Sequence, residues 1–164
     1  MARKKKVKEE VKEVFEEYLI TDPCYVLTWQ DLDVACKELD GGKDQYDRFN
    51  AVVTAKLNEI AGTKDAVACE TGAGDWKNAM TGSHDREDVI YPNFFADSGM
   101  VCVVKYNEAM KNQFEVVKRY GHLFERGGAA LVRTKGKVKI TMNRKFITVV
   151  KIKDEDGSFS SLTM

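Results

Sequence analysis

The sequence predicts an α+β protein: a single domain with a mainly antiparallel sheet and two to four helices. The length of 164 residues suits one domain, and the composition, 43% apolar and 32% charged, is typical of a globular protein. Helical periodicity occupies residues 28–62, and short apolar runs separated by turn residues follow it. No linker and no internal repeat divides the chain, so these elements are expected to share one core.

The N-terminal segment, residues 1–17, is basic at its start and acid-rich afterwards. Its bases are Arg3, Lys4, Lys5, Lys6 and Lys8. Apolar residues recur at helical spacing among the charges, at Val7, Val11, Val14 or Phe15, and Tyr18. This spacing allows a short amphipathic helix, so we divide the chain into this segment and an α+β domain of residues 18–164.

The domain is expected to open with a strand at residues 18–21. Asp22-Pro23 ends it, because proline has no N–H to donate to a strand ladder. Residues 24–27 are apolar and are predicted to form a second short strand.

Two helices are predicted in residues 28–62. Thr28 is suited to cap the first helix, and Gly41-Gly42 ends it. Its apolar stripe comprises Leu32, Ala35, Cys36 and Leu39. The second helix runs from about residue 44 to Gly62, with an apolar side made of Tyr46, Phe49, Val53, Leu57 and Ile60. Trp29, at the entry of the first helix, is expected to anchor the pair.

Strands dominate the rest of the chain. They are predicted at residues 66–70, 89–91 and 94–95, and most clearly as a buried strand at 100–104. Asn107 is expected to cap a helix that carries Met110, Phe114 and Val117 and ends at Gly121. A meander over 129–134, 138–142 and 145–153 follows, with a last hairpin turn at 154–157, and the polar stretch 81–88 is typical of a loop.

Three short motifs occur in order: DPCYVL at 22–27, TGAGD at 71–75 and DSGMVCVV at 97–104. Together they resemble a loosely defined family of uncharacterised bacterial and bacteriophage proteins, over roughly residues 18–104. The chain departs from that pattern at Trp76, where a second glycine often stands, and by a long insertion at 77–93. The resemblance implies a phage or prophage-type protein with a β-rich fold. The family has no assigned activity, so no catalytic residue is carried over.

Charge and cysteine content indicate the cellular compartment and the partners that the protein is expected to have. Lys plus Arg and Asp plus Glu number 26 each, so net charge gives no overall attraction to nucleic acid or acidic membranes. The basic start runs into glutamates, not into the apolar region of a secretory signal, and no apolar run approaches the length of a membrane helix. We expect a bacterial or infected-host cytoplasm, where the four cysteines stay reduced and mostly buried. No C-x-x-C pair suggests zinc, and no cofactor is implied.

Three turn aspartates, Asp22, Asp75 and Asp97, are candidate metal ligands or acid–base groups, since carboxylates at strand ends build many hydrolytic sites. Each also stands where an Asp side chain accepts hydrogen bonds from nearby backbone N–H groups, and we favour that turn role. A loop with Thr71, Gly72 and Gly74 is a candidate phosphate cradle. It matches neither a P-loop nor a dinucleotide fingerprint, so an ordinary glycine turn is favoured.

Two other sites are compatible with the residue types. Cys24 or Cys102 with His84 or His122 would make a nucleophile–base pair, but apolar flanks raise a thiol pKa, which disfavours a nucleophile. Residues 133–153 hold eight bases and no acid, and the spacing of Lys135, Lys137 and Lys139 suits one side of a strand that could contact phosphates. The same pattern is expected for the solvent-facing side of a half-buried sheet, and we favour this interpretation.

The resulting hypothesis is a small cytosolic interaction or accessory protein, phage-related and non-catalytic, whose partner is another protein. The alternative is a small hydrolase or nucleotide-binding enzyme with a site formed by the turn aspartates and the Gly72–Gly74 loop. Nucleic-acid binding by the C-terminal lysines is a third hypothesis and is not favoured. No membrane partner is expected.

Overall fold

The computed structural model describes residues 15–70, 76–79, 89–91, 93–96, 98–117, 128–135, 137–142, 147–152 and 159–163. The first half contains β1 (Phe15–Thr21), the 3-10 helix η1 (Pro23–Tyr25), α1 (Trp29–Cys36), α2 (Gln45–Ala61) and β2 (Val67–Glu70). The second half contains β3 (Trp76–Ala79), β4 (Val89–Tyr91), β5 (Asn93–Ala96), β6 (Met100–Lys105), α3 (Glu108–Val117), β7 (Ala129–Lys135), β8 (Lys137–Met142), β9 (Ile147–Ile152) and β10 (Phe159–Thr163). The predicted α+β class with an antiparallel sheet is confirmed.

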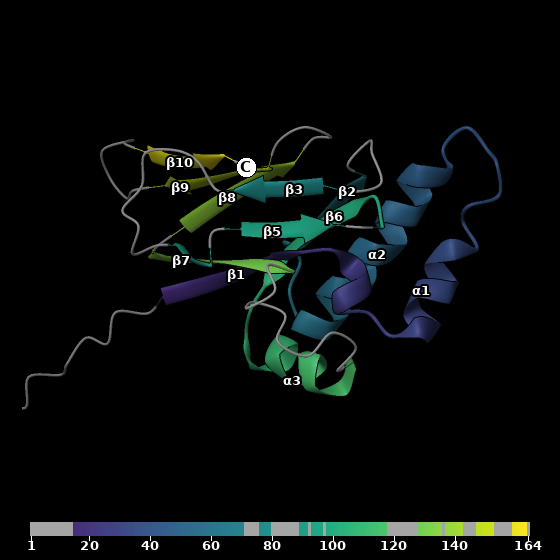
Figure 1. Ribbon diagram of the computed structural model, residues 1–164, viewed down its shortest axis with the longest axis horizontal. Coiled ribbons are helices and arrows are strands. Elements are labelled where there is room, and N and C mark those ends of the chain that lie inside the picture. Colours follow the sequence, from purple (N-terminus) through teal and green to yellow (C-terminus); the bar gives the residue numbers. More distant parts are fainter. Residues whose placement is uncertain are drawn as a thin grey trace, which may run out of the picture.

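The main sheet is five-stranded and antiparallel, in the order β2-β6-β1-β7-β4. Strand β1 lies at its centre, where Leu19 stands opposite Val104 of β6 and Leu131 of β7. The remaining strands form a three-stranded sheet, β10-β9-β8, and a two-stranded sheet, β3-β5. In Figure 1 α1 and α2 lie to the right of β1 and β7, α3 lies below these strands, and β8, β9 and β10 lie above them.

The main core lies between the sheet and the helices. Leu19, Cys102 and Val104 belong to the same buried cluster as Val53 and Leu57 of α2. Residues at the alternate strand positions, Ile20, Val101 and Val103, have no exposed surface either, although alternation directs them to the opposite face. Strand β5 contacts β1 and β7, and β8 contacts β2, so the small sheets contribute to covering that second face. Burial on both faces explains why residues 100–104 are continuously apolar instead of alternating.

The helix boundaries follow from local capping. The Thr28 hydroxyl accepts a hydrogen bond from the N–H of Asp31 at 3.2 Å, as a helix cap does. Helix α2 ends at Gly62, whose φ of 66° is left-handed and therefore suits glycine. Asn107 caps α3, because its Oδ1 accepts from the N–H of Met110 at 3.1 Å.

Several predictions about the first half were wrong. Residues 23–25 form η1 and not a strand, because Asp22 caps this turn and Pro23 supplies the fixed φ of its first residue. Helix α1 ends at Cys36, before Gly41-Gly42, because the N–H groups of Glu38 and Leu39 bond three residues back and tighten the chain.

The exposure of the hairpin residues also differs from prediction. Leu39 and Tyr46 are exposed, and Trp29 is 66% exposed, so it does not anchor the helices by burial. Other buried residues of α1 and α2 fill the interface instead, namely Ala35, Phe49, Val53, Leu57 and Ala61.

At the N-terminus, β1 begins at Phe15, so the helical spacing predicted through Tyr18 ends in a strand. Residues 1–14, which carry the rest of that prediction, lie outside the described residues, as do the loop at 81–88 and the turn at 154–157. Strand β3 was not predicted. Among the helices that the structure describes, none has the length and apolar content needed to cross a bilayer.

Replacing Asn107 by Ala tests a junction between two helices. Its Nδ2 donates to the Ala61 carbonyl at the end of α2 at 2.7 Å, while its Oδ1 caps α3. Losing both bonds is expected to lower the free energy of unfolding by about 2 kcal/mol. Denaturant titration measures this change. Asn112→Ala, at an exposed position of α3, is the control and should shift stability by no more than about 0.5 kcal/mol. Equal midpoints for the two variants would contradict the junction.

Candidate functional site

Asp22 is the most constrained polar residue of the described chain, because its side chain is an ionisable carboxyl group and has no exposed surface. Its Oδ1 accepts from the N–H of Cys24 at 2.9 Å and from the Ser98 hydroxyl at 2.7 Å. Its Oδ2 accepts from the N–H of Ser98 at 2.9 Å. The carboxylate therefore joins the end of β1 to the turn before β6, across 76 residues of sequence.

These contacts give Asp22 a structural role. A buried carboxylate whose two oxygens together accept three hydrogen bonds is satisfied by the protein itself. In this chain the bond joins two of the three motifs, since DPC supplies the carboxylate and DSG supplies the serine that binds it. The other two candidate aspartates, Asp75 and Asp97, lie outside the described residues, as does the loop with Thr71, Gly72 and Gly74.

The thiol of Cys102 lies beside this carboxylate and is fully buried. Its Sγ donates to the Thr21 carbonyl at 3.2 Å, and the Thr21 hydroxyl donates to the Gly128 carbonyl at 2.9 Å. Burial first, and then the charge of Asp22, raise the pKa of Cys102 well above its ordinary value. A neutral buried thiol is the opposite of a nucleophile. His84 and His122 lie outside the described residues.

The other cysteines differ in exposure. Cys24 and Cys69 are partly buried, and burial raises the pKa of Cys69 to about 11. Cys36 is exposed on α1, so the expectation of mostly buried cysteines is wrong for this residue. Cys36 is the last residue of α1. Because Ala35 is the residue of this helix that faces the core, its neighbour Cys36 points outward. All four thiols are free of disulfides.

The three candidate nucleic-acid lysines do not share one strand. Lys135 is the last residue of β7, in the main sheet, whereas Lys137 and Lys139 belong to β8, in the three-stranded sheet. Lys135 and Lys137 therefore belong to different sheets, and the alternation in the sequence spans two strands. The register places Lys137 opposite Ile152 and Lys139 opposite Val150.

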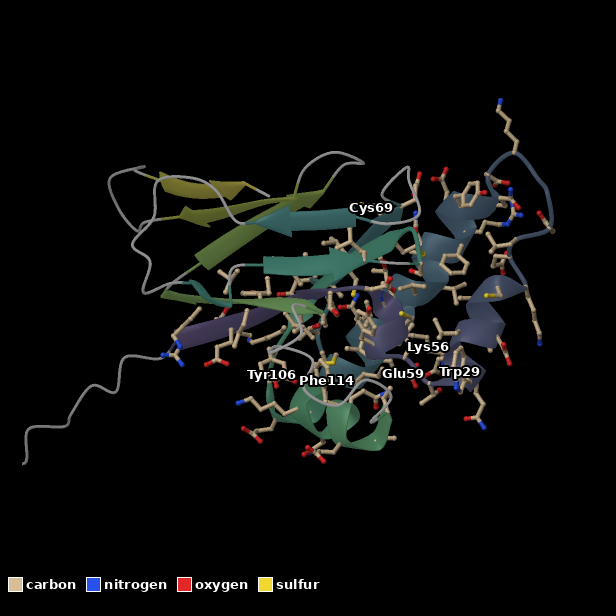
Figure 2. All side chains as sticks on the ribbon, viewed as in Figure 1. Trp29, Lys56, Glu59, Cys69, Tyr106 and Phe114 are labelled. Atoms are coloured by element: carbon tan, nitrogen blue, oxygen red, sulfur yellow. The ribbon has the colours of Figure 1, made fainter. Side chains whose placement is uncertain are left out.

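The feature that sequence reasoning missed is the outer surface of the α1–α2 hairpin. Of the five large apolar residues that are exposed in the described chain, four belong to this hairpin: Trp29, Val34, Leu39 and Tyr46. Figure 2 shows Trp29 at the start of α1, at the edge of the molecule away from the sheet. Helical spacing shows which apolar residues share one side of a helix. When the helix is short, it does not show whether that side is buried or exposed.

The turn end of this hairpin is organised by Arg48. Its guanidinium forms ion pairs with Glu38 at 3.0 Å, with Asp40 at 2.7 Å and with Asp44. The N–H of Gly42 and the charge of Arg48 lower the pKa of the Asp40 carboxyl. Three carboxylates around one guanidinium hold the turn in place, and Lys37 and Lys43 lie exposed in the same stretch. We call the exposed residues of 29–48 the hairpin surface.

Within the residues that the structure describes, no group of three His, Cys, Asp or Glu side chains is arranged to hold a metal ion. Comparison with protein-family models, curated proteins and solved structures finds no match to this chain.

Asp22→Asn tests the structural role of the buried carboxylate. The amide nitrogen cannot accept a hydrogen bond, so at least one bond to Cys24 or Ser98 is lost in a buried setting, at an expected cost of about 2–3 kcal/mol. Asp33→Asn, at an exposed position of α1, should change stability by less than about 0.5 kcal/mol. Denaturant titration compares the two, and thermal unfolding with added Mg²⁺, Mn²⁺ or Ca²⁺ should leave the parent Tm unchanged. A cation-dependent rise in Tm that Asp22→Asn removes would instead indicate a metal site.

Thiol alkylation should rank the cysteines by exposure and pKa. At pH 8 the exposed Cys36 is expected to react first, and Cys102 only as fast as the protein unfolds. Because the pKa of Cys69 is about 11, its thiolate fraction and its rate should rise about tenfold per pH unit from pH 8 to 10. Peptide mass spectrometry after timed quenching gives each rate. Rapid labelling of Cys102 in the native protein would contradict its burial.

Proposed function

We propose that this protein is a non-catalytic interaction or accessory protein that binds another protein through the hairpin surface. The observation that carries the proposal is the concentration of exposed apolar side chains there, led by Trp29 at 66% and Tyr46 at 54% exposed. The proposal places the protein in the cytoplasm, and the phage or prophage setting rests on the three motifs alone.

The residue types on the hairpin surface suit recognition. Trp and Tyr bury a large area on binding and lose few rotamers, which is why they are enriched among residues that dominate binding energies. The hairpin itself is rigidly supported: Phe49, Val53 and Leu57 of α2 are in the main core, and Arg48 holds the turn between the helices. A surface presented by fixed helices loses little further entropy when it binds.

The state of Asp22 also favours binding over catalysis. A hydrolase built on the turn aspartates needs their carboxylates turned toward a substrate or metal. Asp22 instead directs both oxygens at protein donors and is shielded from solvent.

The experiment compares captured proteins from a bacterial extract for three baits. Leu39→Ser with Tyr46→Ser removes apolar contacts from the hairpin surface, whereas Val116→Ser removes a 70%-exposed apolar residue from α3. Quantitative mass spectrometry is expected to find proteins that the parent and Val116→Ser retain alike and that the hairpin variant loses at least tenfold. Circular dichroism checks that all three baits are folded. The same retained set for all baits would overturn the proposal.

A further inference from the structure

The hairpin surface combines apolar side chains with negative charge. Residues 29–48 contain six acids and three bases, and two of the bases, Lys37 and Lys43, are exposed. Arg48 is already engaged by Glu38, Asp40 and Asp44, while Asp33 and Asp47 are exposed. Six acids against three bases give residues 29–48 a net charge of −3, and exposed Leu39 and Tyr46 lie within this range. A complementary partner therefore needs positive charge together with a small apolar contact.

The chain itself contains such a segment. Residues 3–8, RKKKVK, hold five bases, one valine and no acid, and they precede the first described residue, Phe15. The sequence is neutral overall, so this basic segment and the acidic hairpin represent a separation of opposite charges within one molecule. Unlike charges separated in this way attract between copies.

The same copy cannot make the contact with its whole basic segment. Strand β1 starts at Phe15 at the end of the molecule opposite to the hairpin (Figure 1). From Phe15 back to Lys8 an extended chain spans about 25 Å at most. The seven residues of β1 alone span about 23 Å, and the hairpin turn lies beyond the far end of that strand. A second copy has no such restriction.

We propose that the hairpin surface binds the basic segment, residues 3–8, of a second copy of this chain. This inference rests on the proposed function and names the partner of that surface. Lysines of the segment pair with the exposed hairpin carboxylates, such as Asp33 and Asp47, and Val7 contacts the exposed Leu39 and Tyr46. Two copies that exchange their segments make two identical contacts and close as a dimer; a one-way exchange continues into longer assemblies.

The first test measures mass by light scattering and sedimentation of the full chain at 50 and 500 mM salt. The parent is expected to associate at low salt and to weaken about tenfold or more at high salt, where the Debye length falls from about 14 Å to about 4 Å. Val116→Ser should behave as the parent, and Leu39→Ser with Tyr46→Ser should be monomeric. A parent that is monomeric at both salt concentrations would overturn the inference, as would association that is indifferent to salt.

A charge exchange provides the sharper test. One variant reverses the segment with Lys4→Glu, Lys5→Glu and Lys6→Glu, and the other reverses exposed hairpin acids with Asp33→Lys and Asp47→Lys. Each alone is expected to be monomeric, and an equimolar mixture to associate, because each segment then faces a hairpin of opposite charge. A mixture that stays monomeric contradicts the inference. If the hairpin surface still captures another protein in the bait comparison, the proposed function stands and only the occupant is wrong.

Discussion

The buried carboxylate of Asp22 is the interaction on which the arrangement of this fold depends. It lies where the central strand β1 ends and the chain turns into η1 and α1, and it accepts from Ser98, just before β6. Because β1 and β6 are neighbours in the main sheet, one side chain aligns the ends of both strands and directs the chain toward the helices. A carboxylate with no exposed surface would be destabilising if it were not fully hydrogen-bonded. The three donors satisfy the carboxylate only when β1 and the turn before β6 are in this arrangement, so the buried group favours one geometry.

Around this junction the sheet is stabilised from two sides. Val101 and Val103 are as fully buried as Cys102 and Val104, so β6 has no solvent-facing side at its centre. The helices alone could not cover both faces of the sheet. The small sheets contact β1, β2 and β7 and contribute to this cover, whereas the α1–α2 hairpin carries four of the five large apolar side chains that are exposed in the described chain.

Local signals in the sequence predicted the elements well where one physical cause dominated. An uninterrupted apolar run identified β6. Thr28 and Asn107 identified the starts of two helices, and Gly62 identified the end of a helix. Prediction failed where distant contacts decided the outcome. Asp22 was interpreted as turn chemistry, and its Cys24 bond is indeed local, but the bonds from Ser98 come from 76 residues away. The lysine alternation similarly did not reveal that Lys135 and Lys137 belong to different sheets.

Local sequence signals also failed to predict which residues of the α1–α2 hairpin are exposed, and this failure matters more for the function. An apolar side chain on a short helix can lie in the core or at the surface, and periodicity does not separate the two positions. Here the core positions are filled by Phe49, Val53 and Leu57, which lie on the long helix α2. The eight residues of α1 offer only Ala35 as a fully buried side chain, so Trp29 is left at the surface. Exposed aromatic surface of this kind favours association, and the acidic residues around it restrict which partners can approach. In the role proposed for this protein, the charge of the hairpin selects the partner, whereas its apolar residues supply the binding energy.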